Sequence, residues 1–343
     1  MQSFFRYFFP ILSGLLFRMS LLCLLLIYTS ATYGQDIQLS LYEYHPLFVN
    51  AAYTGSFDGD WRLSAGYRNQ QVATAQSYTT AIAGFDGHVY LRNQKIGAGL
   101  YVINDQSGIG GLTFNKIYGS LAYEKDIQNN IFGIGLQGGF ISGSVNDWGT
   151  WDNVNGTFTA PSGELYFGQK TSYFDINLGI SWRRKINHIL PQAGISILHL
   201  NQPNISFIEG EGEQNIQMLA DIRIDLEVGD KLVLTPLVLF NTLSGINQSV
   251  AGANISYLLN GKRNPVKAVF GGVHLQNGIL ENASSLMLQI GARITRIDIV
   301  LGYERNLGKF SETTGSTGAF EVAVVYKSIS TVLNTYSIPC ERY

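Results

Sequence analysis

The sequence predicts an all-β fold, a transmembrane antiparallel up-and-down β-barrel of about 14 strands that follows a signal peptide. Apolar and polar residues alternate along many segments of about ten residues, and a period of two places the two sets on opposite faces of a strand. Beyond the N-terminal region, no apolar run approaches the roughly 20 residues of a membrane-spanning helix. The connections between the alternating segments also tend to be long and short in turn, as in single-chain outer-membrane barrels.

The composition favours one closed β domain over two soluble domains. The 343 residues include 38 glycines, 12% aromatic residues and only 14% charged residues, spread evenly along the chain. Glycine and aromatic residues in such numbers are typical of closed all-β architectures. The formal net charge of −2 gives no basic surface of the kind that binds nucleic acid, so we expect no nucleic-acid partner.

Residues 1–34 are predicted to be an export signal peptide. Two arginines are the only charged residues of this stretch, an apolar core spans residues 21–27, and a small residue, Gly34, ends it. We expect cleavage near Gly34. The true start is either Met1 or Met19.

The two cysteines are Cys23 and Cys340. Cys23 follows Leu22, where a lipoprotein signal would have a small residue, so a lipid anchor is the weaker interpretation. Cleavage of the signal would leave one cysteine and no internal disulfide. Stability must then come from strand pairing.

Residues 35–60 form a lead-in that we expect to be periplasmic and outside the barrel wall. They lack a sustained alternation and are punctuated by Pro46, Gly55 and Gly59. Two interpretations are open. The segment is a structured strap that plugs or caps the barrel mouth, or it is a surface that faces a partner protein.

The barrel is expected to span residues 61–328, and residues 329–343 to form a periplasmic tail. Hydrocarbon offers no water to the backbone, so the sheet must close on itself, and an even number of strands returns both ends of the wall to one side of the membrane. The alternating segments lie near residues 61–69, 77–87, 95–105, 113–125, 130–142, 172–184, 190–200, 215–227, 231–241, 247–258, 266–276, 284–295, 297–306 and 318–328.

The segment at residues 172–184 shows the pattern most clearly. A membrane strand needs roughly nine to eleven residues, whereas strands of soluble sandwiches usually have about five or six, and this segment is longer than a sandwich strand usually is. Its apolar face carries Phe174, Ile176, Leu178, Ile180 and Trp182, and its opposite face Asp175, Asn177, Gly179, Ser181 and Arg183.

Connection lengths provide an independent check. With a periplasmic N-terminus, the odd-numbered connections are extracellular and should be long, and the even-numbered ones should be tight. The long set includes residues 104–112, 143–171, 201–214 and 307–317, and the tight set residues 126–129, residues 228–230 and Arg296, although the links before Lys95 and around Gly261 are longer.

Some side chains are expected to face the lumen or the membrane interfaces. Asp221, Arg223 and Asp225 occupy consecutive inward positions with alternating sign, which predicts a cross-linked polar interior rather than a pore selective for one charge. Aromatic residues near strand ends fit the interfacial girdles. They are Trp61, Tyr67, Tyr123, Trp182, Tyr303 and Tyr326.

The search for catalytic and metal-binding motifs finds little. There is no H-E-x-x-H, no G-x-S-x-G and no paired Cys/His pattern, so we expect no enzymatic activity, no metal and no cofactor. His199 lies near a strand end beside a loop, and a surface enzyme that uses it with a loop serine is the catalytic alternative. Residues 152–156 lack the spacing of a calcium loop, and Asn155-Gly156 favours a tight turn.

The longest connection, residues 143–171, is the candidate partner-binding surface. Large aromatic residues dominate binding hot spots because they bury much area at a small entropic cost. The alternative is that they fold inward over the barrel mouth. The aromatic residues are Trp148, Trp151, Phe158, Tyr166 and Phe167.

The lead-in and the first strand carry a more specific pattern. Residues 44–56 read YHPLFVNAAYTGS, and residues 67–70 read YRNQ. Together with the Cys-containing C-terminus, this resembles the PorP/SprF family of type IX secretion system outer-membrane proteins of Bacteroidota, although His45 stands where asparagine is usual and Ala51 where a second proline is usual. The residues that match the family motif are Pro46, Leu47, Asn50, Ala52, Tyr53, Gly55, Tyr67, Arg68 and Gln70.

The resemblance implies a non-enzymatic component of secretion or gliding in a Gram-negative, Bacteroidota-like outer membrane. Family members look like accessory barrels that bind secreted adhesins through C-terminal domains, or that link the translocon to periplasmic components. The implied partners are outer-membrane lipid, an adhesin-type secreted protein and other type IX secretion components. Trp148 and Trp151 would contact the secreted protein, and residues 35–59 the periplasmic partners. A porin, or a transporter of hydrophobic substrates resembling the FadL family, is the alternative.

Overall fold

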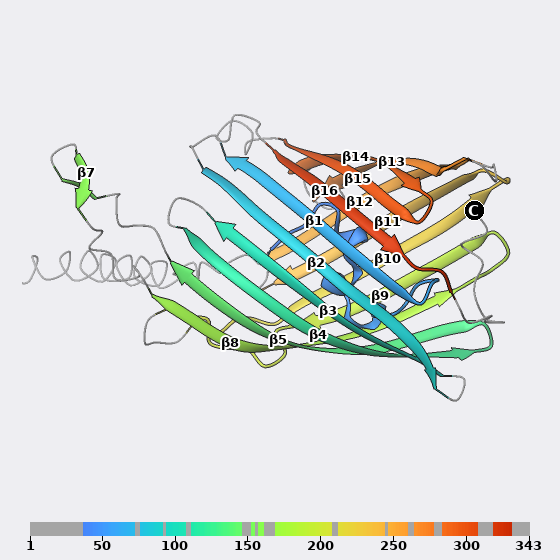
Figure 1. Cartoon of the computed structure of the whole chain (residues 1–343), viewed down its shortest axis with the longest axis horizontal. Helices are drawn as coiled ribbons and strands as arrows, with labels where there is room; N and C mark the ends of the chain where they lie inside the picture. The colour runs from blue at the N-terminus through green and yellow to red at the C-terminus, as the bar shows by residue number, and fades with distance from the viewer. Residues whose placement is uncertain are drawn as a thin grey trace, which may run out of the picture. The chain divides into compact units, whose positions relative to one another are not determined.

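Among the residues that the structure describes, fourteen antiparallel strands close into a barrel in this computed structural model (Figure 1). The predicted fold class is confirmed, and each of the alternating segments corresponds to one strand of the wall. The wall strands are β1 (Trp61–Val72), β2 (Gln76–Leu91), β3 (Gln94–Ser107), β4 (Leu112–Ile127), β5 (Asn130–Val145), β8 (Lys170–Arg184), β9 (Ile189–Leu198), β10 (Gln217–Val228), β11 (Leu232–Leu243), β12 (Ile246–Leu258), β13 (Val266–Gln276), β14 (Ser285–Ile294), β15 (Ile297–Asn306) and β16 (Ala319–Lys327).

The structural description covers most of the barrel and the segment before it. The predicted signal peptide, most of the predicted C-terminal tail and Trp148, Trp151, Tyr166 and Phe167 lie outside the described residues. The described ranges are 37–72, 76–91, 94–107, 111–145, 152–154, 157–160, 169–207, 212–243, 246–259, 264–277, 283–307 and 318–330.

Each wall strand pairs with its neighbours in sequence, and β1 pairs with β16 to close the sheet. The closing register runs from Arg62 opposite Lys327 to Gln70 opposite Ala319. β5 pairs directly with β8, while the intervening β6 (Asp152–Val154) and β7 (Thr157–Ala160) form a separate two-stranded sheet. Within the described residues, no helix is long and apolar enough to cross a membrane.

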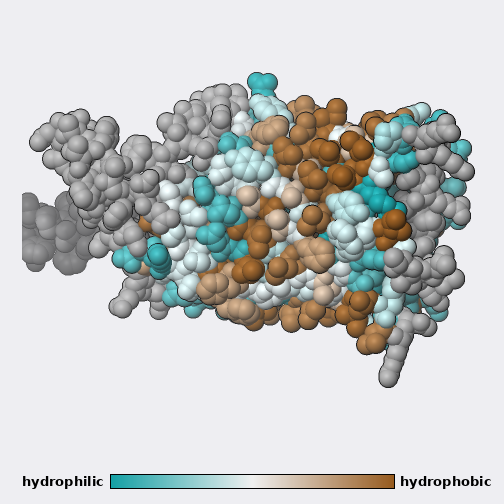
Figure 2. Space-filling view, viewed as in Figure 1, coloured by the Kyte–Doolittle hydropathy of each residue, from teal (hydrophilic) through white to brown (hydrophobic). Residues whose placement is uncertain are grey.

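Side chains sort by face as the alternation predicts. On β8, Phe174 and Ile180 are 54% and 49% exposed on the outer face, whereas Asp175 and Asn177 are buried in the interior. Figure 2 shows apolar residues gathered over the barrel wall. In the predicted girdle, Trp61 contacts both Phe85 and Tyr326 through its ring. The outer face therefore suits lipid, and the inner face carries most of the buried polar and charged residues of the strands.

The two ends of the barrel differ. We call the end where β1 begins and β16 ends the tight-turn end, because residues 92–93, 128–129 and 295–296 connect strands there. We call the opposite end the long-loop end, because residues 146–169 and 199–216 connect strands there. In bacterial outer-membrane barrels the longer connections are usually extracellular.

Residues 37–60, which we call the strap, run inside the barrel (Figure 1, blue). They form three short helical turns, η1 (Tyr42–Tyr44), α2 (Pro46–Val49) and η2 (Ala51–Tyr53). Proline at the start of α2 loses no helical hydrogen bond, and the Asn50 side chain accepts a hydrogen bond of 2.8 Å from the backbone N–H of Ala52. The structure therefore corresponds to the first of the two interpretations of this segment, a strap that plugs the barrel.

The strap supplies much of the barrel's interior core. Its apolar side chains pack against inward-facing residues of β2, β3, β4, β5 and β11. A second cluster joins Leu41 to inward residues of β14, β15 and β16. The larger cluster contains Leu39, Tyr42, Leu47, Val49, Tyr53, Ile82, Tyr101, Ile103, Tyr118, Ile141 and Leu237.

Candidate functional site

Asn50, a residue of the family motif, joins the strap to two strands of the wall. Its side-chain amide donates hydrogen bonds to the backbone carbonyls of Ile180 on β8, at 3.0 Å, and Ile195 on β9, at 3.2 Å. Its side-chain oxygen accepts the hydrogen bond from the backbone N–H of Ala52, at the start of η2. These contacts use both amide N–H donors and the carbonyl acceptor of the asparagine side chain.

Tyr53 and Gly55 hold the next part of the strap. The Tyr53 hydroxyl donates a hydrogen bond of 2.6 Å to the Asp221 carboxylate, and burial together with that carboxylate raises the pKa of Tyr53, so the hydroxyl keeps its proton. The Gly55 N–H donates to Asp86 at 2.7 Å, and its φ of +69° is one that glycine adopts without strain. A Cβ there would also lie 2.8 Å from the Cα of Gly97.

Arg68 anchors the beginning of the strap. It forms ion pairs with Glu304 at 3.0 Å and Glu321 at 3.3 Å, and the side chains of all three are nearly buried. Glu321 accepts hydrogen bonds from the backbone N–H groups of Ser40 at 2.8 Å and Leu41 at 3.0 Å. Of the other motif residues on β1, Tyr67 points outward and the Gln70 side chain accepts a hydrogen bond from Arg68.

His45 and Leu47 lie in the middle of the strap. The His45 ring is 2% exposed and stands directly over Gly66, where any Cβ would overlap it. Burial lowers the pKa of His45 to about 4, with a further contribution from the nearby Arg62. The Leu47 carbonyl accepts a hydrogen bond of 2.7 Å from the Gln137 side chain.

Glycines of the wall let the strap backbone approach closely. A Cβ on Gly135 would overlap the carbonyl group of Ala51, and one on Gly97 would overlap the carbonyl of Thr54. Gly179 lies against the Asn50 side chain and Gly194 against the Tyr53 hydroxyl. We call these four inward glycines, which lie against residues of the strap, the glycine bed.

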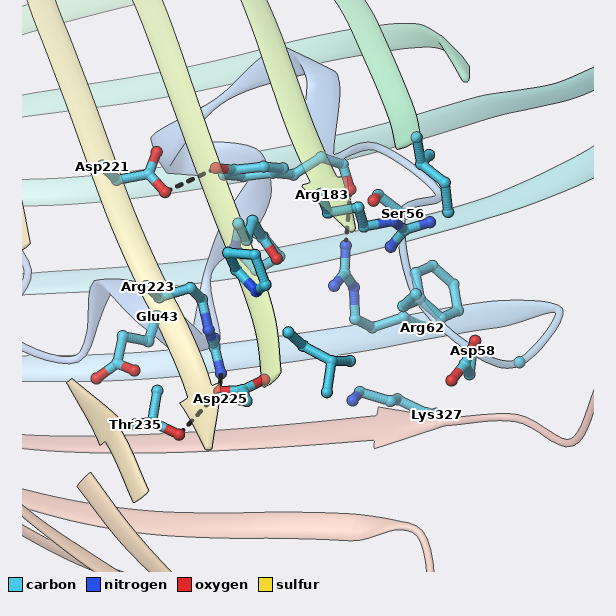
Figure 3. Close-up of a pocket in the computed structure, with 18 of the residues that line it drawn as sticks. Glu43, Ser56, Asp58, Arg62, Arg183, Asp221, Arg223, Asp225, Thr235 and Lys327 are labelled. Carbon is cyan, nitrogen blue, oxygen red and sulfur yellow. Dashed lines mark hydrogen bonds and ion pairs between the residues drawn. The ribbon is translucent and has the colours of Figure 1, made fainter. Parts of the chain in front are cut away.

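Below the strap, a cavity of about 1490 Å³ opens at the tight-turn end, and we call it the vestibule. Strap residues form its roof, and charged wall residues of both signs line its sides (Figure 3). One group on β10 and β11 includes Asp221, Arg223, Asp225 and Thr235. The group across the cavity includes Asp58, Arg62, Arg183 and Lys327.

Most vestibule charges are paired. Arg62 binds Asp86 through two nitrogens, Arg223 pairs with Asp225 at 3.0 Å, and Glu124 bridges Lys95 and Arg183 at 3.1 Å each. Burial raises the pKa of the strap residue Asp58 against the opposing influence of Arg183 and Lys95.

The predicted cross-linked interior at Asp221, Arg223 and Asp225 is present in the structure. Arg223 pairs with Asp225, and Thr235 donates a hydrogen bond of 2.8 Å to the same carboxylate. Asp221 is bound by Tyr53 of the strap. A lining of both signs favours a structural or protein-binding interior over selection of one ion type.

His199, the residue of the catalytic alternative, is buried at the end of β9. Its Nδ1 lies 3.0 Å from Asp175, which also accepts a hydrogen bond of 2.7 Å from the Tyr118 hydroxyl, and its backbone N–H donates to Asn177 at 3.0 Å. Within the described part of the chain, no group of side chains is arranged to hold a metal ion.

Of the loop residues expected to bind a partner, Phe158 is on β7, and the other four lie outside the described residues. The structure therefore brings most of the motif residues together at the strap, whereas the arrangement of the loop residues lies outside the described part of the chain. Sequence reasoning missed the vestibule and the glycine bed. Gly133 and Gly135 occupy alternate, inward positions of β5, and this pattern in the sequence could have indicated the glycine bed.

Comparison with known proteins gives a family and a fold. The family model described as type IX secretion system membrane protein PorP/SprF matches residues 31–326. The search of curated proteins finds no significant match.

Two solved structures illustrate the fold. The CymD monoaromatic hydrocarbon channel is 11% identical with a TM-score of 0.51, covering 84% of this chain and 93% of that one. The TodX deltaS2S3 mutant monoaromatic hydrocarbon channel is 10% identical with a TM-score of 0.51, covering 82% and 92%. At these identities the similarity concerns the barrel fold alone.

Proposed function

The chain belongs to the PorP/SprF family of type IX secretion system membrane proteins, and we propose that it is a non-enzymatic, accessory outer-membrane barrel of that system. In this role it binds a secreted adhesin-type protein at the cell surface, or links the translocon to periplasmic components, or does both. The membrane-barrel fold and the family both indicate the outer membrane.

The observation that carries the proposal is the occupied lumen. The strap contacts nearly every strand of the wall, through Glu321, Asn254, Gln137, Ile180 and Asp221 among others. A conducting pore needs an open path, whereas a barrel filled by its own chain is suited to binding at its two ends. This argues against the porin alternative.

The two ends supply the two proposed contacts. At the long-loop end, the connection with Trp148, Trp151, Phe158, Tyr166 and Phe167 would contact the secreted protein, because aromatic side chains dominate hot spots. At the tight-turn end, the vestibule would receive a periplasmic partner, since its charges of both signs suit a protein surface more than a small apolar substrate.

The loop contact is tested by retention of the secreted client. We expect that deletion of residues 145–168, or the double change Trp148→Ala and Trp151→Ala, releases the client from cells and abolishes its co-purification with the barrel. A matched polar variant, Asn153→Ala with Asn155→Ala, should retain it. Unchanged retention in the deletion variant would contradict the loop assignment.

Conductance separates the proposal from the transport alternative. In a planar bilayer, the wild-type barrel should show no steady open current, because the strap fills the lumen. A variant lacking residues 38–56 should conduct and serves as the positive control. A steady current through the wild-type protein, or uptake of fatty acid that depends on it, would favour the transporter.

A further inference from the structure

The strap crosses the barrel from one end to the other in chain order. Gln38 contacts Gln248 and Gln276, which lie at the long-loop ends of β12 and β13. At the other extreme, the backbone N–H groups of Asp60 and Trp61 donate to the Ser328 hydroxyl, just beyond the tight-turn end of β16.

The intermediate contacts follow the same progression. Ser40 and Leu41 bind Glu321, only two residues from the long-loop end of β16. Glu43 accepts hydrogen bonds of 2.9 and 3.0 Å from Asn254, in the middle of β12. Gly55 binds Asp86, in the half of β2 that leads to the tight-turn end. The strap therefore passes through the lumen from the long-loop end to the tight-turn end.

The upper end of the strap is part of a row of uncharged polar side chains. The Gln217 amide donates to Asn241 at 2.9 Å, and Asn241 donates to Gln248 at 3.4 Å. Gln38 bonds to Gln248 and accepts from Gln276 at 3.1 Å, so it stands between β12 and β13 in the row. We call these five side chains the amide row.

The course of the strap has one consequence for the topology of the chain. A barrel with an even number of strands returns both ends of its wall to the tight-turn side, and Trp61 and Lys327 are indeed there. The position of the chain before β1 differs, because the strap begins, at Ile37, at the long-loop end. The beginning of the strap and the end of β16 therefore face opposite sides of the membrane.

We propose that the strap presents its N-terminal end at the cell-surface mouth of the barrel, where it and the partly exposed members of the amide row form part of the surface that contacts the secreted protein. Gln217 is buried and supports the row from behind. The position of the strap's N-terminal end follows from the contacts described above. The identity of the partner rests on the proposed function. Amide side chains both donate and accept hydrogen bonds, which suits the main chain of a polypeptide.

Accessibility on intact cells tests the topology. A short epitope inserted between Asp36 and Ile37 should be stained by antibody on intact cells. The same epitope inserted after Ser330 should be stained only after the outer membrane is permeabilised. Staining of the first epitope only after permeabilisation would overturn the proposal.

Cysteine labelling gives a second measurement with smaller changes. In a Cys340→Ser background, Gln38→Cys should react with a membrane-impermeant maleimide on intact cells, and Asp230→Cys, in the exposed turn after β10, should react only after permeabilisation. Mobility of unheated protein on a denaturing gel shows that each variant is folded. Equal protection of Gln38→Cys and Asp230→Cys on intact cells would contradict the proposal.

Client retention then tests the contact itself. Attaching a bulky maleimide at Gln38→Cys should lower client binding at least tenfold relative to the unlabelled variant, while the same label at Asp230→Cys in permeabilised cells should leave it unchanged. If the labelled strap end retains the client fully, the contact is disproved. If the unlabelled barrel binds no client, the proposed function fails, whereas the accessibility results still decide the topology.

Discussion

The two sides of the lumen wall hold the strap by different means. The wall of β3, β5, β8 and β9 meets the strap with glycines, so that strap groups lie against bare backbone at Gly97, Gly135 and Gly179. The wall of β1 and β12 to β16 meets it mainly with long polar side chains, among them Arg68 and Glu321, beside the apolar contacts of Leu41.

The difference shows how a strap can be held in a wet lumen. Close approach to glycine excludes water and sets the position of the backbone sterically, but it supplies few directional bonds. Buried ion pairs and amides supply direction, but they require every partner to be present. The glycine side therefore defines where the strap lies, and the polar side defines its register.

The largest effect is expected from breaking the polar side at Arg68. Arg68→Ala leaves the carboxylates of Glu304 and Glu321 buried without their cation, and removing one partner of a buried pair costs about 3–5 kcal/mol of the free energy of unfolding. Urea unfolding in detergent measures the change. The exposed Arg305→Ala on β15 is the control and should change stability by less than about 0.5 kcal/mol.

The buried His45 predicts a pH dependence. Its pKa of about 4 is lower than the ordinary 6.5, so the unfolded chain binds a proton more readily, and stability is lost as the pH falls from 6.5 towards 4. The loss at pH 4 should reach roughly 3 kcal/mol, at about 1.4 kcal/mol per pKa unit.

The contribution of His45 to the pH dependence is measured by comparing the wild type with a variant that lacks the imidazole. Thermal unfolding at pH 7 and pH 4 is compared for the wild type and His45→Asn, and the variant should lose less stability on acidification. Identical losses in both proteins would show that His45 does not stay neutral inside the barrel.

On the glycine side, Gly135→Ala should be costly because its Cβ meets the backbone of Ala51, which cannot rotate away. Overpacking of this kind costs about 1–3 kcal/mol. Gly119→Ala on β4 is the matched control, because no atom lies within 4 Å of its Cβ, and it should be neutral or slightly stabilising. Equal effects of the two changes would refute the steric account of this wall.

The smallest effect is expected at Ser40. Its hydroxyl donates a hydrogen bond of 2.5 Å to Glu304, and Ser40→Ala should cost roughly 1 kcal/mol. A double-mutant cycle with Glu304→Gln measures the coupling between the two residues. A coupling energy of zero would remove Ser40 from the set of polar anchors.

The fold could be predicted because its signal is local. Alternation along residues 172–184 or 297–306 depends only on neighbours in the sequence and on the two faces of a strand, so the number of strands and their positions to within a few residues could be predicted. The string at residues 44–56 likewise marked the strap as distinctive, and Asp221, Arg223 and Asp225 marked a cross-linked interior.

The placement of the strap was decided only by the tertiary structure. Asn50 finds its partners at Ile180 and Ile195, and Ser40 finds Glu321, all of them far away in the sequence. No local pattern encodes those distances. By itself the sequence determined a closed, lipid-facing wall, and closure of that wall brought remote residues together into a filled lumen and a charged vestibule, because contacts across a barrel depend on strand register and not on chain proximity.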